Sequence, residues 1–93
     1  MDQVALLRIH KAVEAAKHAA HEANLDRCDI GDLDEVIETV DRELGRPAPN
    51  KNTLTLMLNS LARSLTAVPS AAEVCREIDR ALRLAGLPAT WNQ

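Results

Sequence analysis

Apolar residues recur every three or four positions along four stretches of the chain, and polar or charged residues fill the positions between them. This spacing is typical of amphipathic helices, because residues three or four apart lie on one face of a helix. Glycine, proline and asparagine separate the stretches, as expected of turns. We therefore predict helices over about residues 3–23, 33–44, 53–67 and 71–85, with a linker over 46–52 and a short tail over 88–93.

The predicted helix starts rest on capping residues. Asp32 followed by Glu35, and Ser70 followed by Glu73, fit the capping box, in which two side chains accept hydrogen bonds from free N–H groups of the first turn. An asparagine or threonine at 52–53 is the predicted cap of the third helix.

The first predicted helix carries a seam of apolar residues with coiled-coil spacing, and its second half is almost entirely alanine. Small side chains let another helix approach closely, so we expect a second copy or a partner helix to bury this seam. A short chain has a thin core and gains most from such burial, which favours a homodimer. The seam comprises Leu6, Ile9, Val13, Ala16, Ala20 and Ala23.

Composition agrees with an all-α fold. Trp91 is the only aromatic residue, and the β-branched residues that strands also prefer are scarce. With one aromatic residue, an aromatic platform for single-stranded nucleic acid is excluded. The length of 93 residues suits one domain. We predict a single helical domain over residues 1–93, built as an irregular antiparallel bundle of four helices.

Negative charge is concentrated in one segment. Eight acidic residues and two arginines lie between Asp26 and Glu43, which gives this segment a charge of -6 in a chain of net charge -3. Such asymmetry steers charged partners, so we expect the polar face of the second helix to bind a basic protein. The acidic residues assigned to this face are Asp34, Glu35, Glu38 and Asp41.

Two leucines depart from the pattern, because Leu56 and Leu84 fall on the polar sides of the third and fourth predicted helices. With Leu87 and Trp91 they would form an apolar patch for a partner or a second copy. In the alternative, the tail folds back and covers both leucines.

One alternative function is metal binding on the first helix. His18 and His21 lie on one face with Glu14 and Glu22, and imidazoles and carboxylates are ligands of divalent metals. Lys17 on the same face opposes a cation, and a solvated face with ion pairs one turn apart is the simpler interpretation. We predict no cofactor.

A second alternative is DNA binding, because residues 61–76 fit the pattern of a helix-turn-helix. Contacts to nucleic acid would then come from Ser70, Arg76, Arg80 and Arg83. An acidic chain lacks the electrostatic attraction to phosphate that dominates such binding, and acidic residues alternate with these arginines.

Catalysis is not indicated, since no pattern in the chain brings a histidine to Cys28 or Cys75. No signal peptide or membrane span is recognised, so we expect a cytoplasmic protein. Together these features predict a small non-catalytic module for protein–protein interaction that associates with itself: a regulator, an inhibitor or an assembly partner.

Overall fold

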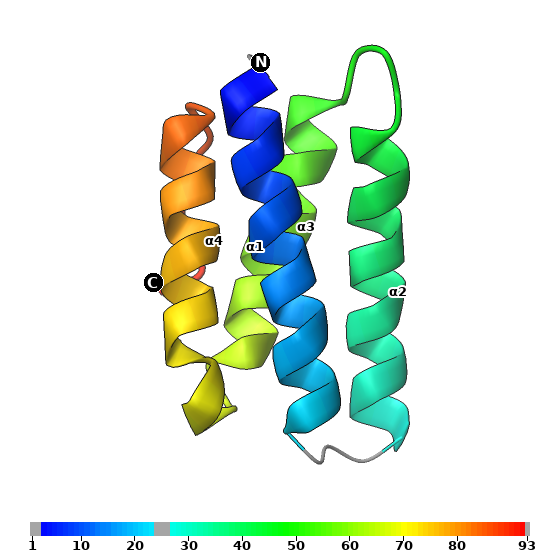
Figure 1. Cartoon of the computed structure of the whole chain (residues 1–93), viewed down its shortest axis with the longest axis vertical. Coiled ribbons are helices and arrows are strands. Elements are labelled where there is room, and N and C mark those ends of the chain that lie inside the picture. Colours follow the sequence, from blue (N-terminus) through cyan, green and yellow to red (C-terminus); the bar gives the residue numbers. More distant parts are fainter. Residues whose placement is uncertain (1–2, 24–26, 93) are drawn as a thin grey trace.

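Four α-helices lie side by side around one apolar core (Figure 1). The structure is a computed structural model that describes residues 3–23 and 27–92, and of residues 27–30 it describes the backbone alone. No strand occurs in these residues, which confirms the prediction of an all-α fold. The helices are α1 (Gln3–Glu22), α2 (Arg27–Leu44), α3 (Lys51–Leu65) and α4 (Ala72–Leu84), and a short 3-10 turn, η1 (Pro69–Ala71), precedes α4.

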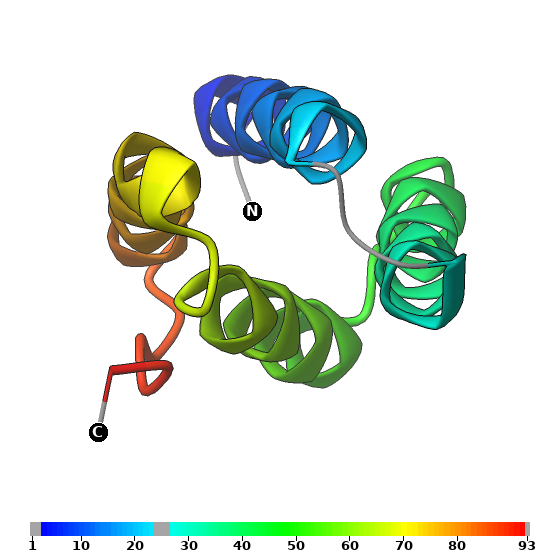
Figure 2. The same cartoon turned by 90° about the horizontal axis from the view of Figure 1, so that it is seen from below.

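The helices follow one another around a ring and alternate in direction, as in an antiparallel bundle (Figures 1 and 2). Each helix therefore packs against two neighbours: α1 and α3 both lie between α2 and α4, on opposite sides of the bundle. This arrangement leaves each helix one outward face and two grooves, one shared with each neighbour.

Aliphatic side chains fill the core without any aromatic ring. Leucines spaced at three and four residues along α3 are fully buried, and they meet Ile9 of α1, Val40 of α2 and Ile78 of α4. Such a core is sufficient because each buried leucine or isoleucine contributes roughly 1.5–3 kcal/mol by leaving water. The leucines are Leu54, Leu58, Leu61 and Leu65.

The alanine-rich seam of α1 lies inside the bundle. Ala16 and Ala20 are fully buried in the same core as the leucines of α3. Small side chains here let α1 approach its own neighbours closely, so the seam is not available to another chain. The expectation that a second copy buries it is therefore wrong.

Helix α2 begins at Arg27, well before the predicted start at Leu33. Asp32 and Glu35 thus lie inside the helix, and the predicted capping box does not form. Gly31 is accommodated because one glycine in a helix costs only about 1 kcal/mol relative to alanine, less than the burial of Leu33 and Ile37 on the same helix contributes.

The other two predicted caps do not form either. Asn50 caps α3, where its side chain accepts a hydrogen bond from the Thr53 backbone N–H at 3.1 Å. Ser70 lies within η1, and neither η1 nor α4 has a side-chain cap. Pro69 explains this difference, because it starts the 3-10 turn ahead of the helix.

Candidate protein-interaction surface

The acidic face of α2 divides into paired and unpaired carboxylates. Asp34 is 3.2 Å from the His21 ring of α1, and Glu38 accepts a hydrogen bond from Arg42 at 3.1 Å. Glu35 and Asp41 have no side-chain partner among the described residues. Of the four acidic residues assigned to this face, two therefore have no ion pair or hydrogen-bond partner for their side chain within the described part of the chain.

Asp32 also has no partner within the described part of the chain, and it lies one turn before Glu35. Because the sequence pattern predicts Asp32 as a helix cap, Asp32 is not among the residues predicted for the acidic face. Its spacing of three from Glu35 is nevertheless the signal that would have placed both carboxylates on one face of a longer helix.

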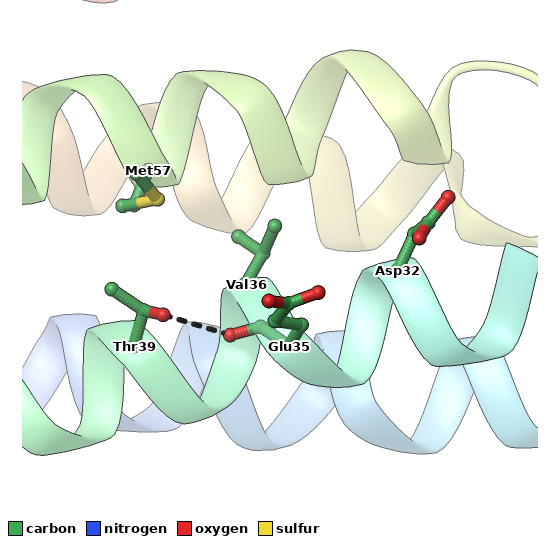
Figure 3. Close-up of a pocket in the computed structure, with 5 residues that line it drawn as sticks. All are labelled: Asp32, Glu35, Val36, Thr39 and Met57. Carbon is green, nitrogen blue, oxygen red and sulfur yellow. Dashed lines mark hydrogen bonds between the residues drawn. The ribbon is translucent and has the colours of Figure 1, made fainter.

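Asp32 and Glu35 line a groove between α2 and α3 (Figure 3). Its floor is apolar, because Val36 of α2 and the half-buried Met57 of α3 point toward each other across the groove. Thr39 turns its hydroxyl inward along α2 and donates to the backbone oxygen of Glu35 at 2.9 Å. The groove thus combines exposed negative charge with an apolar surface.

The outward surface of α3 is unusually poor in charge. The helix contains no acidic residue, and Leu56 near its middle is 65 % exposed. We call this surface the α3 face. It consists of Thr53, Leu56, Met57, Ser60, Arg63 and Ser64.

The C-terminal tail lies along the other side of α3, toward α4, where a hollow lined by Leu56, Arg63 and Thr90 among others remains. Asn59, only 5 % exposed, donates to the Pro88 carbonyl at 2.9 Å and accepts from the Thr90 N–H at 2.7 Å. Arg63 also donates to the Thr90 carbonyl, at 3.3 Å. Side-chain atoms of α3 thus replace water at three backbone groups of the tail.

Trp91 connects the tail to α4. Its indole N–H donates to the Asp79 carboxylate at 3.1 Å, and the same carboxylate accepts from Arg83 at 2.8 Å. The hydrogen bond from Arg83, with a second from Trp91, lowers the pKa of the Asp79 carboxyl below its ordinary value. Trp91 is therefore a half-buried part of the fold.

The four residues of the expected apolar patch do not meet on one surface. Leu87 is buried in the core, where it follows Gly86 and donates its backbone N–H to the Leu82 carbonyl at 2.8 Å. Leu84 is 51 % exposed, but it follows Asp79 by five residues, about 140° around α4, and so points away from the tail. Leu56 belongs to the α3 face. The tail folds back but covers neither Leu56 nor Leu84, so the alternative, in which it covers both leucines, is wrong on that point.

Each of the three arginines predicted to contact nucleic acid pairs with a carboxylate of its own helix, α4. Arg76 bonds Glu73, Arg80 bonds Glu77 at 2.8 Å, and Arg83 bonds Asp79. Moreover, α3 and α4 run antiparallel side by side (Figures 1 and 2), whereas the helices of a helix-turn-helix cross at a steep angle. Ser70 is exposed within η1.

The residues considered for metal binding lie on the exposed surface of α1. His18 is 4.0 Å from Glu22, His21 is engaged with Asp34, and Lys17 lines the same hollow as Glu14 and both histidines. Among the described residues, no group of three or more His, Cys, Asp or Glu side chains is placed to hold a metal ion.

Cys75 is buried, and its thiol donates to the Ala62 carbonyl at 3.5 Å. Burial raises the pKa of the Cys75 thiol, which disfavours the nucleophilic thiolate. The side chain of Cys28 lies outside the described residues.

No helix in the described residues is both long and apolar enough to cross a membrane. Comparison of the chain with protein-family models, with curated proteins and with solved structures finds no match.

Proposed function

We propose that this chain is a non-catalytic, cytoplasmic protein–protein interaction module, a regulator, inhibitor or assembly partner, that binds a basic segment of a protein in the α2–α3 groove. The observation that supports this function best is that Asp32 and Glu35, which have no partner among the described residues, lie beside the apolar floor of Val36 and Met57.

The two parts of the groove contribute different terms to binding. The carboxylates belong to the most negative segment of the chain, so they attract a basic partner and orient it as it approaches. The apolar floor contributes affinity by removing Val36, Met57 and the partner's apolar side chains from water. An amphipathic helix with lysines beside a row of leucines has both properties and fits a groove between two helices.

A designed peptide tests this function. It has about 14 residues, with leucines on one helical face and lysines beside them, and it is titrated into the protein while the methyl resonance of Met57 is followed by NMR. The Met57→Leu variant assigns that resonance by its disappearance. We expect a saturable shift that weakens as salt is added, because exposed charges are screened.

The matched control is a peptide in which serines replace the leucines and the lysines are kept. It should shift the Met57 methyl group much less, because it lacks the apolar half of the interaction. The proposed function is wrong if the leucine peptide leaves this resonance unmoved, or if both peptides act equally.

A further inference from the structure

The α3 face has opposite charges along its two edges. On the α2 side lie the carboxylates of Asp32 and Glu35, for which the described residues supply no partner. On the tail side lies Arg63, whose guanidinium is held there by the Thr90 carbonyl. Between the edges the surface is uncharged and has the exposed Leu56 near its centre.

The two edges carry their charges at about the same level of the bundle. Met57 lies beside Thr39, and Asp32 points toward the C-terminal part of α3 (Figure 3). Arg63 lies six residues after Met57, which is about 9 Å farther along α3. Because α2 runs antiparallel to α3, going back from Thr39 to Glu35 or Asp32 is a step of about 6–10 Å in the same direction.

This polarity makes the α3 face complementary to itself in one orientation. When two copies face each other across a two-fold axis parallel to α3, the acidic edge of each lies opposite the basic edge of the other. Leu56 then meets Leu56 of the second copy. A two-fold axis perpendicular to α3 would instead set acidic edge against acidic edge.

We propose that a second copy of this chain covers the α3 face, with the two α3 helices parallel, Leu56 at the centre, and Arg63 of each copy paired with Asp32 and Glu35 of the other. The inference rests on the proposed function, since the acidic edge is the wall of the same α2–α3 groove. One helix face buries little area, so the dimer is a weak one that exchanges rapidly with the monomer.

Charge exchange between two variants tests the pairing. Arg63→Glu should be monomeric because the introduced carboxylate would face acidic groups, and Asp32→Lys with Glu35→Lys should be monomeric because the introduced lysines would face Arg63. In an equimolar mixture both edges become complementary, so a heterodimer should form. Light scattering at concentrations up to about 1 mM measures the mass, and circular dichroism checks that each variant is folded.

The exposed leucines supply the matched control. Leu56→Asp should weaken dimerisation at least tenfold, whereas Leu84→Asp, an equally drastic change on α4, should leave it unchanged. A wild-type chain that stays monomeric up to about 1 mM, or a mixture of the charge variants that gains no mass, overturns the dimer. If the dimer is overturned but the leucine–lysine peptide still shifts the Met57 methyl resonance, the proposed function stands, and a second copy of the chain is not the partner that it binds.

Discussion

The two grooves beside α3 differ in how their polar groups are satisfied. Toward α4, the tail lies along α3, and Asn59 exchanges hydrogen bonds with the tail backbone while Trp91 bonds Asp79. Toward α2, the carboxylates of Asp32 and Glu35 have no partner among the described residues. The polar groups of the first groove are satisfied within the chain, whereas no described residue compensates the two carboxylates of the second.

The charged faces of α2 and α4 differ in how far their charges are compensated within the described residues. The outer face of α4 is as rich in charge as that of α2, but its arginines are compensated one turn away on the same helix. Exposed pairs of this kind contribute only about 0–1 kcal/mol each and leave little net field. Our proposal therefore rests on the carboxylates of α2 that have no partner among the described residues, and not on the total charge of the chain.

The largest expected effect on stability comes from Asn59→Ala, which breaks the hydrogen bonds between α3 and the tail. Thr90 and Pro88 would lose their partner, and a small cavity would form at a position that is 5 % exposed. We expect the free energy of unfolding to fall by about 2 kcal/mol in urea titrations. Asp32→Ala in the open groove is the control, and an equal loss there would contradict the contrast between the grooves.

A smaller effect is expected from Asp79→Asn, which weakens the bonds to Arg83 and Trp91. Because the folded state lowers the pKa of Asp79 below its ordinary value of 3.8, this carboxylate stabilises the fold above that pH, and its contribution is lost as the pH falls through the folded pKa. Wild type should exceed the variant in stability by about 1 kcal/mol at pH 6 and by less at pH 3.

Trp91 fluorescence provides an independent reading of the same contact. The emission of Asp79→Asn at neutral pH should shift to the red as the indole becomes hydrated, and wild type should shift in the same direction as the pH falls through the lowered pKa of Asp79. A variant whose emission matches wild type at every pH would show that Asp79 does not hold the tail.

The smallest effect on stability is expected from Asp32→Asn with Glu35→Gln in the open groove. Among the described residues these carboxylates have no side-chain partner. The free energy of unfolding should therefore change by less than about 0.5 kcal/mol, and any change should be a gain from reduced repulsion. A loss above about 1 kcal/mol in thermal or urea unfolding would mean that they have a structural role.

Much of the fold follows from hydrophobic periodicity, because the leucine spacing of α3 and the apolar faces of α2 and α4 are local patterns. The start of α2 could not be predicted in this way. A glycine usually marks a turn, and only the burial of Leu33 and Ile37 in the assembled bundle offsets the cost of Gly31 within the helix.

The candidate site was predictable only in part. The acidic face was visible in the sequence, but the loss of Asp34 to His21 depends on α1 packing beside α2. Likewise, Asn59 sits among polar residues of α3, and nothing in the local sequence shows that its amide meets Thr90, 31 residues later in the chain. Such pairings belong to the tertiary structure, and they decide which charges remain free.

The affinity of the leucine–lysine peptide for two double variants of α2 tests the central claim most directly. Asp32→Asn with Glu35→Gln removes two unpaired carboxylates, and Asp34→Asn with Glu38→Gln removes two paired ones, so both variants change the net charge equally. We predict that the first raises the dissociation constant at least tenfold in isothermal titration calorimetry at low salt, and the second less than threefold. Equal losses of affinity would contradict the account, because binding would then depend on total charge alone.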